Sequence, residues 1–453
     1  MKSKKVLLIT PYFAPQTHAA MFRVYKLARY LPILGYEVHV LTVDTNYLYN
    51  EDDSLLDQLP PTVYIHKARY VEPTFRGLKM AFGGKDTTFA ALKRAHSERV
   101  SPQASADRTV KKAAQPTIIQ RLKKWVENRP DRYWTWYKPA LQKAQEIVQE
   151  HDIHVIYTTT APFTTLRIGQ ALKQKLGVRW VADYRDPLGY SERFSAPSMA
   201  VQTRERSIVK QAMQNADHVV GLARSYEYIF SDLYQLNTER YSFIPTGADD
   251  AYIRAAQEAA GEPTGDCESV LFVGEFLDEY SSNHVFKALD QAARKIDRPI
   301  KLKVIGRREV NQHRVERLLN SAGCENLKQH CEFIDHMAQS KLYEEICRAT
   351  ACLLIPGNSL WWTNFAKLVD YIALQKPVIA DVPKISEARH ELTKSRLGIF
   401  LNGDLIEDTS HLLDVFDQQR KIVDSEYCKL YLASSQVAAF VKVFDRQLEA
   451  SAR

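Results

Sequence analysis

The sequence predicts an α/β protein built from two Rossmann-like domains that face each other across a cleft. One observation is length, because 453 residues exceed what a single hydrophobic core usually supports. A second is that short apolar runs alternate with amphipathic stretches in two successive series. Ligands of such sheets bind at the carboxyl ends of the strands, so the site is expected in the cleft.

The first series opens with a short apolar run at 6–12, a helix over 19–34 that Gly35 stops, and a strand over 37–44. Residues 46–130 are predicted to be an irregular basic insertion, since residues 97–115 are rich in Ser, Ala and Gln. Alternation then resumes. The predicted elements are helix 138–150, strand 154–159, helix 165–176, strand 179–184, helix 200–215, strand 218–222, a helix from about 225, and strand 241–244.

Residues 249–266 contain Gly261, Pro263 and Gly265 and predict a linker before the second series. The elements of that series are strand 269–274, helix 283–296, strand 301–305, helix 312–322, strand 331–334, helix 340–348, strand 351–355, helix 364–374, strands 377–380 and 398–401, and helices 411–423 and 426–448. The predicted domains are therefore 1–248 and 249–425, followed by a last helix within 426–453.

Composition bounds the function. The chain nets only +7, yet residues 67–143 hold 18 Lys/Arg and 6 Asp/Glu. Such a segment is either a solvated insertion or a surface that meets anionic lipid headgroups or acidic glycan, and nucleic acid is a third, less supported alternative. Six cysteines without metal-ligand spacing favour reduced thiols in a cytoplasmic protein. No apolar stretch approaches the roughly 20 residues of a membrane span, and the opening residues fit a buried strand better than a signal peptide.

Within the basic segment, apolar residues recur at helical spacing between basic ones. They are Ile118, Ile119, Leu122, Trp125 and Val126. The pattern fits either an amphipathic helix lying on a membrane or a helix that packs on its own domain. The surrounding charge favours the first alternative, a peripheral protein on the inner membrane face.

Polar side chains follow the predicted strands of the first domain. After the first strand, His18 and Arg23 are expected to contact an acceptor or a phosphate, with an ordinary helical residue as the alternative. At the end of strand 179–184, three ionisable residues are predicted to be catalytic: Asp183, Arg185 and Asp186. The alternative is a structural ion pair in which Arg185 keeps one carboxylate ionised. Thr160 would line the same wall.

In the second domain, a loop with Trp361 and Trp362 precedes helix 364–374. Lys367 and Asp370 are three residues apart and share a helix face. The carboxylate suits a ribose diol, and the lysine with the helix N-terminus suits a pyrophosphate. The alternatives are an exposed ion pair and tryptophans that only pack between domains.

Several other chemistries lack their motifs. The sequence contains no GxGxxG, GxxxxGK[ST], HExxH or GxSxG pattern and no metal-ligand spacing. A dehydrogenase and a P-loop enzyme are therefore disfavoured.

Several segments together resemble the retaining family-4 glycosyltransferases, in particular bacterial polysaccharide-biosynthesis members. They are PYFAP with LARYLPILGYEVHVLT, PDRYWTWYKPA, VIYTTTAPFTTLRIGQALKQKLGVRWVADYRDP, NADHVVGLARS, FIPTGADD and AKLVDYIALQKPVIA. The resemblance covers most of the chain except about 46–128.

The resemblance implies a GT-B fold whose last helix crosses back to the first domain. It also implies a metal-independent, cofactor-free enzyme with a UDP- or GDP-sugar held mainly by the second domain. Asp370 falls on the family's ribose-binding glutamate and Lys367 on the lysine beside it, with Thr363, Asn364 and Gly274 on the same donor side. Retention is thought to proceed by front-face attack, in which the leaving phosphate takes the acceptor proton.

The sequence departs from the family at several positions. Trp362 occupies the first position of the Glu-x7-Glu motif, and Thr246 replaces an asparagine. The glycine pair of the first loop is missing. The turn at Gly274 is not followed by the usual Arg and Lys, so Arg307 and Arg308 are expected to supply that charge.

The function expected from the sequence is transfer of a sugar from a nucleotide sugar to a growing glycan or a lipid-linked acceptor. Two rival functions are a degenerate GT-B scaffold in a glycan-assembly complex and a nucleotide-sugar epimerase. No nucleic-acid partner is expected.

Overall fold

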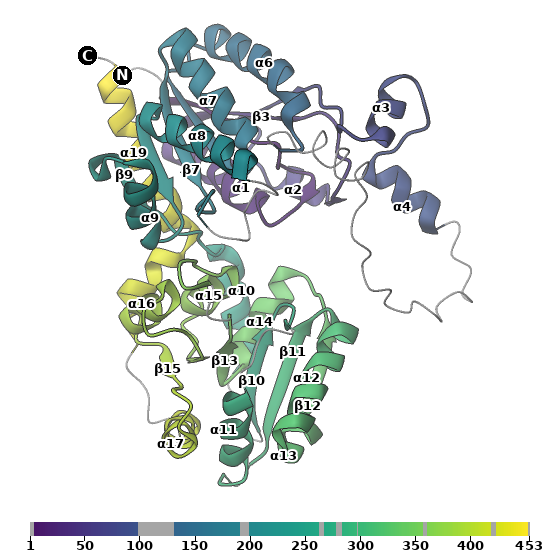
Figure 1. Ribbon diagram of the computed structural model, residues 1–453, viewed down its shortest axis with the longest axis vertical. Helices are drawn as coiled ribbons and strands as arrows, with labels where there is room; N and C mark the ends of the chain where they lie inside the picture. The colour runs from purple at the N-terminus through teal and green to yellow at the C-terminus, as the bar shows by residue number, and fades with distance from the viewer. Residues whose placement is uncertain are drawn as a thin grey trace. The chain divides into compact units, whose positions relative to one another are not determined.

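The computed structural model describes residues 4–97, 131–190, 199–261, 267–277, 283–296, 298–356, 360–417 and 423–451. The chain divides into two compact units, each with its own parallel sheet (Figure 1). Unit 1 comprises Met1–Gly221, Tyr226–Phe243 and Ala439–Arg453, and unit 2 comprises Leu222–Ser225 and Ile244–Ala438.

Unit 1 contains a seven-stranded parallel sheet in the order β5-β3-β1-β6-β7-β8-β9. Its strands are β1 (Lys4–Ile9), β3 (Tyr36–Val43), β5 (Val63–Ala68), β6 (Val155–Thr160), β7 (Arg179–Tyr184), β8 (His218–Gly221) and β9 (Tyr241–Phe243). All residues of β6 are buried, as expected for a central strand with helices on both faces. A short antiparallel pair, β2 (Gln16–Thr17) and β4 (Asn50–Glu51), holds the loop after β1.

The helices of unit 1 connect these parallel strands. They are α1 (Met21–Tyr30), α2 (Ser54–Asp57), α3 (Phe75–Ala81), α4 (Phe89–Ser97), α6 (Tyr137–Glu150), α7 (Phe163–Leu176), α8 (Met199–Asn215) and α9 (Ser225–Tyr234). Helix α7 packs on α6, α8 and β6 through one apolar stripe. Gly177 ends it in the left-handed conformation that glycine adopts readily.

Unit 2 contains a six-stranded parallel sheet in the order β12-β11-β10-β13-β14-β15. Its strands are β10 (Glu268–Val273), β11 (Ile300–Gly306), β12 (Cys331–Asp335), β13 (Ala351–Leu354), β14 (Val378–Ala380) and β15 (Gly398–Phe400). Its helices are α10 (Asp250–Ala260), α11 (Asn283–Ala293), α12 (Arg308–Ala322), α13 (Glu325–Gln329), α14 (Gln339–Arg348), α15 (Ala366–Ala373), α16 (Glu387–Lys394), α17 (Leu405–Phe416) and α18 (Ser425–Cys428). Two apolar clusters form the core of this unit.

The last helix, α19 (Ala433–Ser451), begins in unit 2 and belongs to unit 1 from Ala439 onward. In unit 1 its Phe440 and Phe444 are fully buried, and both rings stand edge-on to Tyr157. Asp445 accepts a hydrogen bond from the Tyr36 hydroxyl over 2.6 Å. The C-terminal part of the chain therefore completes the core around β1 and β6.

Two predictions about local structure were wrong. Residues 46–130 were predicted to be irregular, yet β5 forms the edge of the sheet there. Three of its six residues are half-buried and two are exposed, so it lacks the continuous apolar run of a buried strand. Residues 249–266 were predicted to be a linker, yet α10 occupies most of them. Asp249 caps this helix by accepting from Ala251 N over 3.0 Å, and its buried face carries Ile253 and Ala256.

Within the described residues, no helix combines the length and apolar character that crossing a membrane requires. The predicted amphipathic helix at 118–126 lies outside the described residues.

Candidate active site

In unit 2, the turn after β10 packs against the end of β11. Gly274 N donates to the Ile305 carbonyl over 2.8 Å, and Asn311 Nδ2 donates to the Gly274 carbonyl over 2.9 Å. Gly274 has a φ of +115°, and a Cβ on Gly306 would lie 2.2 Å from the Gly274 carbonyl oxygen. Both glycines are therefore required for this close approach, and buried Asn311 holds the turn in place.

Lys367 lies next to this turn, in the first turn of α15. Its ammonium sits 4.2 Å from the centroid of the Phe272 ring, and a Cβ on Gly274 would lie 4.0 Å from Nζ. No carboxylate or hydrogen-bond acceptor among the described residues pairs with it, so the predicted alternative of an ion pair with Asp370 is not observed. Burial lowers the pKa of Lys367 to about 8. A cation without a partner in a half-buried place is suited to bind an anion.

Asp370 lies one helical turn further along α15. It accepts a hydrogen bond from the Tyr343 hydroxyl over 2.7 Å. Burial, together with the Asp370 carboxylate, raises the pKa of Tyr343, so this phenol stays protonated and remains a donor. Tyr343 thereby fixes the rotamer of Asp370.

The residues before α15 are more enclosed than the sequence indicated. Trp362 is 1% exposed and its carbonyl accepts from Ser225 Oγ over 2.6 Å, so its ring offers no open face for a base or sugar. Asn364 Nδ2 donates to the Tyr431 hydroxyl over 3.2 Å, while its buried Oδ1 has no hydrogen-bond partner among the described residues. Thr363 is half-buried in the same turn.

Basic residues surround Glu275, just after the Gly274 turn. Arg307 lies 3.3 Å from Glu275, with 62% of its side chain exposed, and Arg314 lies 2.9 Å from the same carboxylate. Arg308 is exposed at the start of α12. Sequence reasoning missed Arg314, although its position on the same face of α12 as Asn311 and Arg307 follows from helical spacing.

In unit 1, Arg23 and Asp183 form a buried, two-pronged ion pair. Arg23 Nε and Nη2 donate to the two oxygens of Asp183 over 2.7 and 2.9 Å, and the residues are 2% and 0% exposed. The Tyr157 hydroxyl also donates to Asp183, over 2.5 Å. The expectation that Arg185 pairs with one of the carboxylates was wrong for Asp183, because α1 brings Arg23 to it instead. The alternative of Arg23 as an exposed helical residue was wrong as well.

Arg185 and His18 come together around Tyr12 at the carboxyl end of the sheet. The Arg185 guanidinium lies 5.5 Å from the Tyr12 ring centroid, and the His18 ring lies 4.9 Å from it. His18 Nδ1 accepts from Ala20 N over 3.2 Å, which leaves the proton on Nε2. Burial and then the charge of Arg185 lower the pKa of His18, so this ring is neutral near pH 7.

Thr160 and Asp186 complete the predicted residues of unit 1. Thr160 is fully buried; its hydroxyl donates to the Pro162 carbonyl over 3.0 Å, and its carbonyl accepts from Arg185 N over 3.0 Å. Thr160 therefore shapes the loop that positions Arg185. Asp186 is half-buried, and its carbonyl accepts from Leu188 N over 2.9 Å.

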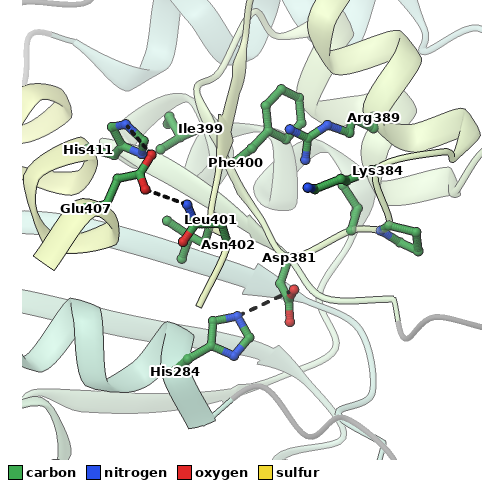
Figure 2. Close-up of a pocket in the computed structure, with 12 residues that line it drawn as sticks. His284, Asp381, Lys384, Arg389, Ile399, Phe400, Leu401, Asn402, Glu407 and His411 are labelled. Atoms are coloured by element: carbon green, nitrogen blue, oxygen red, sulfur yellow. Dashed lines mark hydrogen bonds and ion pairs between the residues drawn. The ribbon is translucent and has the colours of Figure 1, made fainter. Parts of the chain in front are cut away.

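Unit 2 contains a cavity of about 580 Å³ at the carboxyl ends of β14 and β15. Figure 2 shows the side chains that line it. Polar side chains of both signs line it: His284 Nε2 lies 3.5 Å from Asp381, and Asn402 Nδ2 donates to Glu407 over 2.7 Å. The guanidinium of Arg389 lies 4.0 Å from the Phe400 ring centroid. None of the predicted donor residues lines this cavity, and the sequence reasoning did not single it out.

Comparisons with known proteins find similarity at the level of structure. Neither a protein-family model nor a curated protein sequence matches the chain. A sucrose-phosphate synthase from Thermosynechococcus elongatus matches with a TM-score of 0.57 and 14% identity, covering 99% of this chain and 100% of that one. HepE from Anabaena, solved in complex with UDP, matches with a TM-score of 0.57 and 11% identity over 98% of this chain and 100% of that one.

A third solved structure, an α,α-trehalose 6-phosphate synthase from Burkholderia multivorans, matches with a TM-score of 0.56 and 12% identity over 99% of this chain and 98% of that one. At these identities the likeness concerns the fold. Together with the two parallel sheets it shows that the chain has the GT-B fold, as the resemblance implied.

Proposed function

We propose that this chain is a glycosyltransferase that takes its sugar from a nucleoside diphosphate sugar held by unit 2. The observation that carries the proposal is Lys367, a half-buried ammonium with no acidic partner in the described part of the chain, beside the Gly274 turn and one helical turn from Asp370. The GT-B fold adds support, because HepE was solved in complex with UDP and with UDP-glucose.

The pyrophosphate and the ribose of the donor have matching groups in unit 2. The N–H groups at the start of α15 and the Lys367 ammonium suit the pyrophosphate. The Asp370 carboxylate, oriented by Tyr343, suits two ribose hydroxyls. Arg307 and Arg314 add positive charge beyond the Gly274 turn. This arrangement needs no metal ion on the diphosphate, so the proposal includes a metal-independent reaction.

The proposed reaction retains the configuration of the transferred sugar, a hexose or a modified hexose. The bond between the anomeric carbon and the diphosphate breaks, and the acceptor oxygen bonds that carbon on the same face. The acceptor proton passes to the leaving phosphate oxygen, so no side-chain nucleophile is required. On the acceptor side, Arg185, Asp186 and His18 are the proposed contacts, while buried Asp183 and Arg23 position them.

The proposed acceptor is a growing surface polysaccharide or its lipid-linked precursor at the cytoplasmic face of the membrane. Support comes from the net positive charge of residues 67–143, which would be attracted to an anionic membrane surface. Eight of the segment's 18 Lys/Arg and three of its 6 Asp/Glu lie between residues 98 and 130, outside the described residues.

The test is calorimetry of UDP and GDP binding to the wild-type chain and to Asp370→Ala. Loss of a hydrogen bond to a charged group costs about 1.5–3 kcal/mol, so the affinity is expected to fall by about 10- to 150-fold. Glu325→Ala, an exposed acid of the same unit, is the matched control and is expected to bind like the wild type. Circular dichroism checks that Asp370→Ala is folded.

Three outcomes separate the rivals. Equal nucleotide affinity of Asp370→Ala and the wild type would overturn the role of Asp370. Absence of binding to any nucleoside diphosphate would favour the scaffold. Conversion of the donor without any acceptor would favour an epimerase or hydrolase.

A further inference from the structure

Three histidines from distant parts of the sequence meet on unit 1, away from the proposed site. His39 lies on β3, His66 lies on the neighbouring strand β5, and His151 directly follows α6. One ring nitrogen from each lies within 4.8 Å of the other two. Arg185 and His18 follow the carboxyl ends of their strands, whereas His39 and His66 lie within β3 and β5 and His151 precedes the amino end of β6, so the two clusters are separate.

The hydrogen bonds of His39 orient one of its nitrogens toward the other rings. His39 Nε2 lies 2.9 Å from Glu37 Oε1, and the carboxylate fixes the Nε2–H tautomer. The lone pair of Nδ1 then accepts a hydrogen bond from His66 Nε2–H, 3.0 Å away, and a metal ion would take the place of that proton. A carboxylate that accepts the second ring N–H of a histidine is the arrangement that orients histidine ligands of metal ions.

The protonation state of the imidazole rings also suits metal binding. Burial lowers the pKa of His39, and it lowers the pKa of His66 to about 4, with the neighbouring rings adding to the effect. Both imidazoles are therefore neutral near pH 7, which is the form that binds a metal. Two lysines lie near the rings: the charge of Lys143 acts on His66, and Lys5 donates to the His151 carbonyl over 2.9 Å and lies 3.6 Å from Glu37.

The cluster is enclosed on one side and open on the other. His39 is fully buried and its ring stacks on Tyr64 at 4.8 Å, whereas His66 and His151 are partly exposed. An ion can therefore reach the site from solvent. In a tetrahedral zinc site the ligand nitrogens lie about 3.3 Å apart, given Zn–N distances of about 2.0–2.1 Å. The His39–His66 separation of 3.0 Å is close to this value, and the nitrogen of His151 lies within 4.8 Å of both.

We propose that His39, His66 and His151 bind one late first-row divalent cation, most favourably Zn²⁺, with water as the fourth ligand. Three imidazoles suit Zn²⁺, Cu²⁺ and Ni²⁺ rather than Mg²⁺ or Ca²⁺. The ion joins β3, β5 and the end of α6, so its role is to stabilise this edge of the sheet. It stands apart from the proposed glycosyl transfer and does not depend on it.

The experiment titrates Zn²⁺ into the full chain by calorimetry after removal of bound metal with EDTA. The expected result is one ion per chain with a Kd in the micromolar range or below, together with a rise in Tm on metal addition. His66→Ala is expected to weaken binding by at least tenfold, and Glu37→Gln by about 10- to 100-fold as a residue that orients a ligand. His313→Ala, an exposed histidine of unit 2, is the matched control.

Two results would overturn the inference. One is an absence of Zn²⁺ binding at millimolar concentration, which would leave a neutral histidine cluster only. The other is equal affinity of His66→Ala and the wild type, which would place the ion elsewhere, for example at the cysteines. Circular dichroism confirms folding of each variant, and His66→Gln serves if His66→Ala is unfolded. UDP binding measured on the same samples keeps this outcome separate from that of the proposed function.

Discussion

Arg23 and Asp183 each compensate for the burial of the other's charge. Burial acts to lower the pKa of the Arg23 guanidinium, but the Asp183 carboxylate outweighs it and raises that pKa. A buried ion pair contributes little to the free energy of unfolding when it is compared with an apolar pair of the same shape. Removing one partner nevertheless destabilises the protein, because the other charge stays buried without its counter-charge. Any conformation that separates the two charges is therefore high in free energy. The pair in this way fixes the position of the end of β7 and of Arg185, which follows it.

Arg23→Met is expected to destabilise unit 1 by about 3–5 kcal/mol, since Asp183 is left as an unpaired buried carboxylate. Hydrogen exchange of the β7 amides measures the loss within unit 1. The double variant Arg23→Met/Asp183→Asn is expected to recover part of it. Arg204→Met, an exposed arginine of α8, is the control and should change little. Full retention of β7 protection in Arg23→Met would contradict a paired, buried charge.

Lys367 makes nucleotide binding depend on pH. Its pKa of about 8 means that the ammonium is mostly charged at pH 7 and mostly neutral at pH 9 in the free protein. A bound diphosphate favours the charged form, so affinity for UDP is expected to fall as pH rises above about 8, by at most tenfold per pH unit. Calorimetry at pH 7, 8 and 9 measures this slope.

The matched variant is Lys367→Met, which keeps an apolar chain against Phe272 but carries no charge. It is expected to bind UDP more weakly and with no such slope. If the UDP affinity of Lys367→Met depended on pH as that of the wild type does, another group would be the one that titrates. That result would contradict the proposed role of Lys367 in the donor site.

At the scale of elements, the regular parts of the fold followed from periodicity. The predicted strand 179–184 coincides with β7, and helix 138–150 differs from α6 by one residue at its start. Buried parallel strands and amphipathic helices carry strong patterns, whereas the edge strand β5 does not. Helix α10 was not predicted because the glycines and the proline at its C-terminal end are typical of a linker, and the whole segment was interpreted as one.

Candidate residues for the site could be predicted in part, because they lie near the ends of strands that the pattern of apolar residues indicates. Which side chains lie near the end of a strand can be read from the sequence, so Lys367, Asp370 and Arg185 could be singled out as candidates. Which of them pair depends on contacts between distant segments. Arg23 and Asp183 are 160 residues apart, and no local pattern links them. The three histidines of the proposed metal site were missed because their spacing matches no metal motif.

Helix α19 gives a prediction for a whole element. Phe444 is fully buried in unit 1, with Tyr157 at 6.2 Å and Tyr36 at 6.1 Å between ring centroids. Phe444→Ala is expected to cost about 3–5 kcal/mol, the range for large-to-small changes at buried aromatic sites. Because the chain has two units, hydrogen exchange is the suitable measurement: β1 and β6 should lose protection, and β10 and β11 should not.

The control for this prediction is Lys442→Ala on the exposed face of the same helix, expected within about 0.5 kcal/mol of the wild type. Loss of protection in β10 alone would contradict the assignment of this part of α19 to unit 1.

At the scale of the whole molecule, charge is divided unevenly. Residues 67–143 carry 18 Lys/Arg and 6 Asp/Glu, while the chain as a whole nets +7, so the remainder is slightly acidic. Each Lys or Arg near an anionic membrane contributes about 1 kcal/mol, and several acting together suffice for peripheral binding. In the proposed attachment, this long-range attraction would orient the molecule toward the membrane.

The proposed membrane attachment predicts co-sedimentation with vesicles that contain phosphatidylserine and little with vesicles of phosphatidylcholine alone. Binding should weaken as salt is added, because the Debye length shrinks to about 3 Å at 1 M. Replacing Arg121, Lys123 and Lys124 by glutamine should reduce the bound fraction at moderate salt, whereas replacing exposed Lys341 of unit 2 should not. UDP affinity is expected to stay unchanged in both variants, since neither touches the donor site. Equal recovery with the two kinds of vesicle would remove the membrane from the proposal and leave the donor chemistry as it stands.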